Sequence, residues 1–289
     1  MLDLIQNTID GVMIGGAYAL LALGFTLTFG VMRRLNLAFG AIVLCGLYAG
    51  AAAHQALGWG LLGSIAATLA VAVAAGLYVE RLCFRALAES ASIAAMVSSF
   101  AIWMQLEEIA ALLMPRRTYA YPALSEARPW EWAGLSLRPD QLAMAAVALG
   151  AMAALGWTLR RTRFGLAARA VATAPLAARL AGIEPARIGS AMFLLACGLG
   201  GLAGALIAAV DSQVTIKFGM WAMLKGLVAM TLGGIGSIPG AVIGGLALGV
   251  IESNAQWYLG AEWRDIVAYG LLFAVLYWRR GRERPWTNS

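Results

Sequence analysis

Charged residues are scarce in this sequence. They make up 12% of its 289 residues, about half the share of roughly 25% that a soluble chain carries. Hydrophobic residues reach 61%, and the mean hydropathy is +0.77. This composition excludes an ordinary soluble domain and is typical of proteins that cross a membrane several times.

Residues for metal and covalent chemistry are also few. His54 is the single histidine, which excludes a multi-histidine metal centre. Cys45, Cys83 and Cys197 show no CxxC spacing, so the sequence predicts neither disulfides nor a metal site. A P-loop, an HExxH motif and a Ser-His-Asp set are all missing. We therefore expect no enzyme activity, no metal and no cofactor in this chain.

What the sequence does contain is a series of long apolar runs separated by polar segments. Each run is long enough, or nearly so, to cross a bilayer as a helix. The pattern predicts an all-α bundle of about eight or nine spans that forms one transmembrane domain over residues 1–289. The runs cover residues 11–31, 36–53, 59–79, 93–114, 140–159, 188–210, 219–235, 239–259 and 266–278.

The arginines predict how these spans are oriented. Residues 160–187 carry six arginines and one acid, and residues 279–284 carry four arginines and one acid. Basic segments next to spans stay in the cytoplasm, so both segments, and with them the C-terminus, are predicted to be cytoplasmic. Four apolar runs lie between the two segments, and this even number agrees with the assignment.

A glycine-rich run at residues 233–249 has seven glycines among 17 residues. Small residues let helix backbones approach closely in lipid. Pro239 predicts a helix start or a break within the run. Gly236, Gly240 and Gly244 recur every fourth residue and are predicted to share one packing face; Gly245 and Gly249 extend that surface to the adjacent face.

The segment of about residues 160–188, between the fifth and sixth runs, has the features of a short capped helix. Thr173 is predicted to cap its start, with proline in the first turn and glycine after its end. Such a helix either connects two spans along the membrane surface or couples the spans to a cytoplasmic motor subunit. The predicted coupling residues are Thr173, Pro175, Leu176, Arg179, Leu180 and Gly182.

Three motifs follow one another along the chain. The first comprises residues 15–20 (GGAYAL) and 30–40 (GVMRRLNLAFG), and the second residues 163–170 (RFGLAARA) and 178–183 (ARLAGI). The third is the glycine-rich run, which is followed by Glu252. In this order and spacing the motifs resemble the permeases of branched-chain amino acid ABC transporters of the LivH type, and the similarity covers nearly the whole chain.

The resemblance implies an ABC importer permease in the bacterial inner membrane that translocates branched-chain or other hydrophobic amino acids. It implies four kinds of partner: membrane lipid, a second homologous permease subunit, two cytoplasmic P-loop ATPases that bind ATP and magnesium, and a periplasmic substrate-binding protein. No nucleic acid is implied. The family also includes permeases for urea and short amides, so a urea or short-amide permease remains an alternative. A secondary transporter driven by an ion gradient is another, because acidic residues lie within the spans.

Polar residues within the apolar runs are candidates for the substrate path. A charge at this depth costs about 2.5–3.5 kcal/mol and needs a partner or a wet cavity. Such residues either bind the charged groups of an amino acid or hold helices together. Lys225, for example, could form an ion pair with a glutamate of a neighbouring helix. The substrate-path candidates are Asn36, Gln105, Glu107, Glu108, Lys225 and Glu252.

Overall fold

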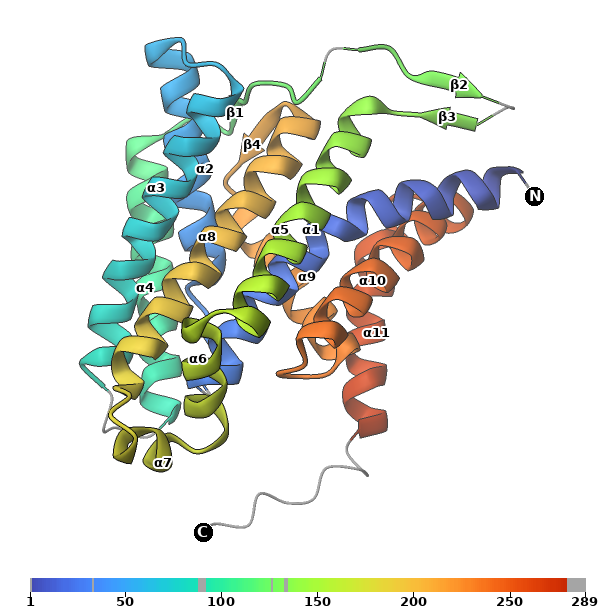
Figure 1. Ribbon diagram of the computed structural model, residues 1–289. Helices are drawn as coiled ribbons and strands as arrows, with labels where there is room; N and C mark the ends of the chain where they lie inside the picture. Colours follow the sequence, from blue (N-terminus) through green and yellow to red (C-terminus); the bar gives the residue numbers. More distant parts are fainter. Residues whose placement is uncertain (1, 33, 88–91, 126, 133–134, 280–289) are drawn as a thin grey trace.

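The computed structural model describes residues 2–32, 34–87, 92–125, 127–132 and 135–279, and these form a helical bundle with two short strand pairs (Figure 1). The bounds are α1 Leu2–Met32, α2 Phe39–Leu57, α3 Leu61–Val79 with a π-helical turn Glu80–Arg85, α4 Ser92–Leu113, β1 Thr118–Ala120, β2 Trp130–Trp132, β3 Leu135–Leu137, α5 Pro139–Arg161, α6 Arg163–Thr173, α7 Pro175–Leu180, α8 Pro185–Asp211, β4 Gln213–Thr215, α9 Phe218–Gly233, α10 Ile238–Leu259 and α11 Trp263–Arg279.

Seven helices in the described part of the chain are long and apolar enough to cross a membrane: α1, α2, α3 with its π-helical turn, α4, α5, α8 and α10. The two remaining predicted runs form the shorter helices α9 and α11, of 16 and 17 residues. Every predicted run thus corresponds to one helix. The predicted number of eight or nine spans is consistent with these nine helices.

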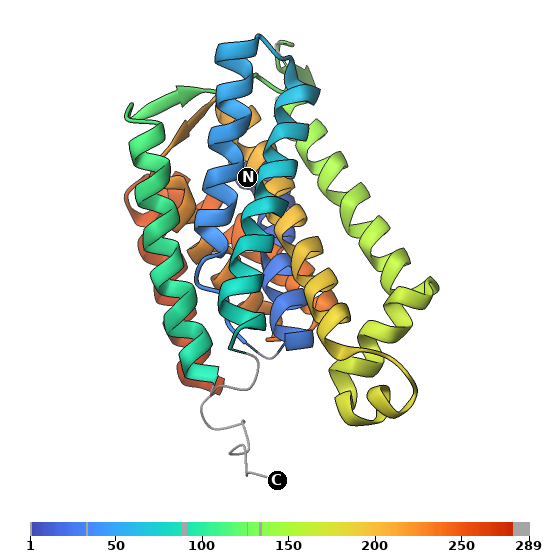
Figure 2. The ribbon, with the colours of Figure 1, turned by 90° about the vertical axis from the view of Figure 1, so that its left-hand side faces the viewer.

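Helix α1 lies at the centre of the bundle and packs against α5, α8, α9 and α10. Its side chains are buried almost without interruption from Gly15 to Thr28. A helix that is apolar all round is stable only where neighbours or lipid cover every face. Figures 1 and 2 show α2, α3 and α4 on one side of this centre, with α5 at the opposite edge in Figure 2.

Glycines of the run 233–249 bring the backbones of α1, α9 and α10 close together. A Cβ at Gly245 would lie 2.4 Å from the Ala19 backbone, and one at Gly249 would lie 2.2 Å from the Gly11 carbonyl oxygen. On the α9 side, Gly240 and Gly244 would place a Cβ 2.0 and 2.1 Å from backbone carbonyl oxygens. Only glycine fits at such approaches.

Gly236 does not belong to this packing face, so that prediction is wrong. It precedes α10 in a turn with φ +82°, and a Cβ there would meet no atom within 4 Å. The Ser237 hydroxyl accepts a hydrogen bond from the Gly240 amide, and Pro239 lies in the first turn, so α10 begins only at Ile238. Glycine is favoured here for its left-handed backbone and not for close packing.

The two ends of the bundle carry different structures. Strand β1 pairs antiparallel with β4, and β2 with β3, at the upper end in Figure 1. Helices α6 and α7 lie at the lower end, where the C-terminal end of α11 also lies. The arginine-rich segment and the end of the last helix therefore share one end, as the even number of intervening runs predicts. Residues 280–289 lie outside the described part.

Candidate functional site

A cavity of about 470 Å³ opens near the strand pairs, and we call it the outer cavity. Its walls combine apolar side chains with charges of both signs, since Asp211 faces a space that Arg138, Lys217 and Arg264 also line. Such a cavity suits a small solute that carries both charges and an apolar group. The described residues that line it are Ile14, Arg138, Gln141, Met144, Ile207, Val210, Asp211, Thr215, Lys217, Phe218, Trp221, Gln256 and Arg264.

Helix ends position the charged groups of the outer cavity. Arg138 directly precedes Pro139 at the start of α5 and forms a 2.6 Å ion pair with Asp140. Asp211 is the last residue of α8, and Ser212 follows it with φ 55° to turn the chain into β4. Because helix ends are where side chains can reach water, these charges avoid the cost of full burial.

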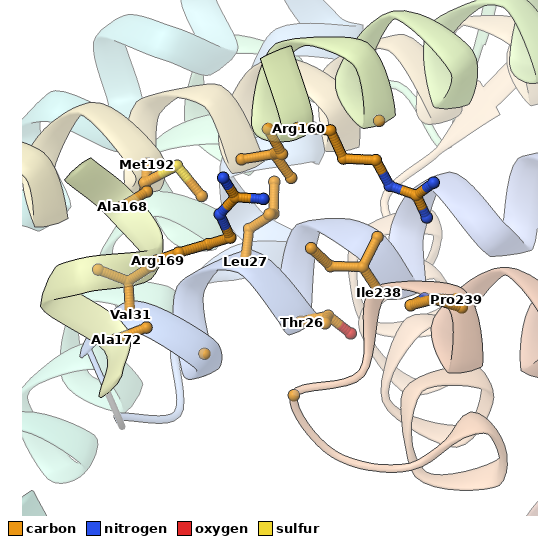
Figure 3. Close-up of a pocket in the computed structure, with 14 residues that line it drawn as sticks. Thr26, Leu27, Val31, Arg160, Ala168, Arg169, Ala172, Met192, Ile238 and Pro239 are labelled. Atoms are coloured by element: carbon orange, nitrogen blue, oxygen red, sulfur yellow. The ribbon is translucent and has the colours of Figure 1, made fainter. Parts of the chain in front are cut away.

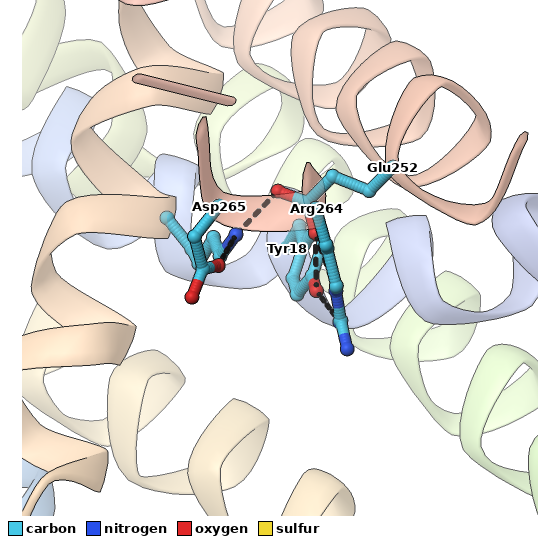
Figure 4. A network of polar contacts seen from close by, with 5 residues as sticks. Tyr18, Glu252, Arg264 and Asp265 are labelled. Carbon is cyan, nitrogen blue, oxygen red and sulfur yellow. Dashed lines mark hydrogen bonds and ion pairs between the residues drawn. The ribbon is translucent and has the colours of Figure 1, made fainter. Parts of the chain in front are cut away.

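Beside the outer cavity, a buried polar network joins four helices (Figure 4). Lys225 Nζ of α9 lies 2.6 Å from Glu252 Oε1 of α10 and 2.7 Å from Asp265 Oδ1 of α11. Arg264 Nε lies 3.1 Å from Glu252 Oε2, to which the Tyr18 hydroxyl of α1 donates at 3.0 Å. Arg264 also donates to the Tyr18 hydroxyl. Two cations and two anions balance, so the network has no net charge.

The network and the outer cavity share Arg264. Its guanidinium lies 6.0 Å from the ring centroid of Trp221, which lines the cavity, while its Nε is bound to Glu252. Lys225, the other cation bound to Glu252, is 0% exposed. The network thus holds the cavity wall in place, and Arg264 is the member that a solute in the cavity can reach.

The sequence places this chain in a family. A sequence model of the family described as "Branched-chain amino acid transport system / permease component" matches residues 7–276. The chain belongs to that family. Like its other members it is a membrane permease, and we call it the permease below.

Curated relatives match over nearly their whole length. The permease is 32% identical over 285 residues to the high-affinity branched-chain amino acid transport system permease protein LivH of Escherichia coli (strain K12), with 94% of this chain and 92% of the relative covered. It is 30% identical over 287 residues to the corresponding protein BraD of Pseudomonas aeruginosa, with coverages of 95% and 94%.

Solved structures share the fold at low identity. A metal-chelate type ABC transporter in an inward-facing conformation superposes with a TM-score of 0.54 at 13% identity, covering 94% of this chain and 85% of that one. PsaBC from Streptococcus pneumoniae in complex with Fab superposes with a TM-score of 0.52 at 10% identity, covering 92% of this chain and 90% of that one. The predicted polytopic helical fold of ABC importer permeases is therefore confirmed.

The six predicted path residues of the permease fall into separate places. Lys225 and Glu252 form the centre of the buried network and do not line the outer cavity. Asn36 is buried before α2, where its Oδ1 accepts a hydrogen bond from the Ala38 amide. The other three, Gln105, Glu107 and Glu108, lie on α4, where the Tyr78 hydroxyl donates to Gln105.

The α4 carboxylates lead to a first prediction. Replacing Glu107 and Glu108 together with glutamine is expected to leave substrate uptake unchanged, because neither residue lines the outer cavity and Glu108 is exposed. The free energy of unfolding should change by less than about 0.5 kcal/mol. Uptake by reconstituted permease complexes tests this. A clear loss of uptake with unchanged stability would place the path along α4.

The predicted coupling residues lie at the α6–α7 end of the permease. Pro175 opens α7, and Gly182, with φ +79°, closes it by donating its amide hydrogen to the Arg179 carbonyl oxygen at 3.0 Å. Thr173 does not cap α7, so that assignment is wrong. It is the last residue of α6, and its hydroxyl donates to the Arg169 carbonyl oxygen, because Ala174 separates the two helices.

Sequence reasoning missed several residues of the site. Tyr18, Trp221, Arg264 and Asp265 are not among the predicted site residues. Arg264 and Asp265 directly precede the predicted apolar run 266–278, and Tyr18 enters only as part of the first motif. A signal was present in the sequence. The Arg264-Asp265 pair directly precedes the last apolar run, so it offers Lys225 a second acid and Glu252 a second cation.

Proposed function

We propose that the permease is a subunit of an ATP-driven importer that translocates branched-chain or other hydrophobic amino acids. The observation that carries this proposal is the match to LivH and BraD over more than nine-tenths of the chain. The outer cavity supports it chemically. Asp211 suits an ammonium group, Arg138 or Arg264 suits a carboxylate, and Met144, Ile207 and Trp221 suit an aliphatic side chain.

Energy must come from other subunits, because this sequence has no P-loop. We infer that two cytoplasmic ATPases bind ATP and magnesium, that a second homologous permease completes the transmembrane part, and that a periplasmic protein delivers substrate. The permease is then an inner-membrane subunit with one transmembrane domain over residues 1–289. Its segment of about residues 160–188 and its C-terminus lie in the cytoplasm, in line with the arginine distribution.

Helix α7 is the proposed contact with an ATPase. Leu176 and Leu180 are 71% and 85% exposed, whereas Ala178 on the other side is buried. Two large apolar side chains on an otherwise arginine-rich segment favour a partner that covers them. Movement of the ATPases would then shift α7 and, through α6 and α8, the spans that line the outer cavity.

The coupling role predicts a specific loss. Replacing Leu176 and Leu180 together with aspartate should lower substrate-stimulated ATP hydrolysis by at least about tenfold, because a buried leucine contributes about 1.5–3 kcal/mol and a charge opposes burial. Membrane insertion should be unchanged. The matched control is Leu57→Asp at the opposite end of the bundle, where Leu57 is 64% exposed. Equal hydrolysis in both variants would disprove the coupling role of α7.

Purification from the native host tests the proposal as a whole. Recovery of P-loop ATPases with the permease is expected, followed by leucine uptake that unlabelled leucine inhibits. Inhibition by urea and not by leucine would assign a urea or amide permease. Uptake that needs an ion gradient and no ATPase would assign a secondary transporter.

A further inference from the structure

A second cavity, which we call the inner cavity, lies at the α6–α7 end of the bundle (Figure 3). Its volume is about 290 Å³, close to the lower limit of the roughly 300–1,000 Å³ that small-molecule sites occupy. Helices α1, α5, α6 and α8, the turn before α10 and the first residues of α10 contribute to its walls. The residues that line it are Thr26, Leu27, Gly30, Val31, Gly156, Leu159, Arg160, Ala168, Arg169, Ala172, Met192, Gly236, Ile238 and Pro239.

The inner cavity is positively charged and otherwise apolar. Arg160 of α5 and Arg169 of α6 extend over it from two different helices (Figure 3). No acidic residue is among the described residues that line it, and neither arginine forms an ion pair with any residue that the structure describes. Leu27, Val31 and Met192 form the apolar wall. Two guanidinium groups over such a wall attract an anion with an aliphatic part.

Thr26 beside this cavity carries a hydroxyl that makes no hydrogen bond in the described part of the chain. Its Oγ1 is buried and the residue is 1% exposed, so a ligand in the cavity does not reach it. The class of ligand is therefore indicated by the two arginines and the apolar wall.

We propose that the inner cavity binds a small aliphatic carboxylate and that the bound ligand restrains the segment of residues 160–188. Arg160 and Arg169 hold the carboxylate, and the aliphatic part lies against Leu27 and Met192. An amino acid fits less well, because its ammonium group finds no acid here, unlike in the outer cavity with Asp211. A branched 2-oxo acid, formed when an amino acid loses its amino group, has the required chemistry.

The position of the cavity explains how a bound ligand would restrain the segment of residues 160–188. This regulatory part of the inference rests on the proposed function. The ligand would contact α6 and, at the same time, α1 and residues 236–239, which form the turn before α10 and the start of that helix. A ligand shifts an equilibrium toward the state that it binds better. If α6 and α7 move with the ATPases, then a ligand that bridges α6 to the spans slows transport. The inner cavity would thus let a product of amino acid breakdown limit further import.

Binding is tested first, on the full-length permease in nanodiscs of phosphatidylcholine, by calorimetric titration with 4-methyl-2-oxopentanoate. L-Leucine is expected to bind at least about tenfold more weakly, because its ammonium group would be unpaired. Decanoate is titrated in parallel, since a carboxylate could also come from the lipid phase. Binding of decanoate alone would assign a fatty acid as the ligand; binding of neither compound would overturn the proposal.

Substitutions locate the site. Arg169→Gln should weaken the binding of 4-methyl-2-oxopentanoate at least about tenfold. Arg163→Gln, on the same helix but outside the cavity, should leave the affinity unchanged. Gly30→Leu fills the cavity without strain, because a Cβ at Gly30 would meet no atom within 4 Å. It should abolish binding, and Gly150→Leu, equally unobstructed on α5 and outside the cavity, should not. Equal affinity in all four variants would place the ligand elsewhere and overturn the proposal.

The regulatory step is tested on the assembled importer. Added 4-methyl-2-oxopentanoate should slow leucine uptake in the unsubstituted complex and have no effect in the Gly30→Leu complex. Uptake without any carboxylate tests the proposed function separately. Normal leucine uptake without carboxylate binding would refute only the inner-cavity site. Carboxylate binding by a chain that transports no amino acid would refute only the proposed function.

Discussion

Replacing Glu252 with glutamine is expected to lower the free energy of unfolding by about 3–5 kcal/mol, the cost of removing one partner of a buried ion pair. Glu252 is the centre of the polar network. It binds Lys225 at 2.6 Å and Arg264 at 3.1 Å, and its own side chain is 2% exposed. Without its charge, the network carries a net positive charge in an apolar bundle, and Lys225 keeps only Asp265.

The buried cysteines offer a direct measurement. Cys83 and Cys197 are free and at most 1% exposed, so a thiol-reactive fluorophore labels them as the chain unfolds. Heating the detergent-solubilised permease with the fluorophore should show a midpoint for Glu252→Gln that is lower by on the order of 10 °C. The measurement needs no transport substrate, so the result does not depend on the proposed function.

Two further variants separate charge from shape. Asp265 is 51% exposed in its side chain, so Asp265→Asn should cost no more than about 1 kcal/mol. The double variant Lys225→Met with Glu252→Gln restores neutrality and should be more stable than the sum of the single changes implies. If Asp265→Asn and Glu252→Gln had equal effects, then the buried charge would not be the cause.

Replacing Gly245 with leucine should prevent α1 and α10 from packing together. A Cβ at this position would lie 2.4 Å from the Ala19 nitrogen and Cα, which are backbone atoms that cannot rotate away. Forcing one extra methyl group into a packed core usually costs about 1–3 kcal/mol. Gly245→Ala should fall in that range, and the larger leucine should exceed it. The expected result is little monodisperse protein on size exclusion and an early thiol-reactivity transition.

The matched control for Gly245→Leu is Gly270→Leu. Gly270 also lies within a helix, α11, but a Cβ there would meet no atom within 4 Å. The substitution adds the same side chain and the same helix propensity, and it should leave the melting midpoint unchanged or slightly raised. A normal midpoint for Gly245→Leu would show that α1 and α10 separate without cost.

Local chemistry made several features of the permease predictable. The apolar runs predicted one helix each, because a bilayer requires every backbone group to be bonded within its own segment. Pro175 and Gly182 were correctly placed at the start and after the end of α7, since caps depend on neighbouring residues. Gly236 and Thr173 were misassigned. A spacing of four residues does not show where α10 begins. The sequence around Ala174 likewise does not show that a helix ends at Thr173.

The sequence by itself therefore determined that this chain is a bundle of membrane-spanning helices, which residues are small enough for close packing, and which end carries the arginines. Those properties depend on composition and on residues near one another in the chain. Only the tertiary structure decided that Lys225 and Glu252 form a closed network with Tyr18, Arg264 and Asp265. The tertiary structure also showed that charges of both signs line the outer cavity. Among the described residues that line the inner cavity, the charged ones are both arginines. Such sites join residues that lie more than a hundred positions apart, and only the packing angles of the helices bring them together.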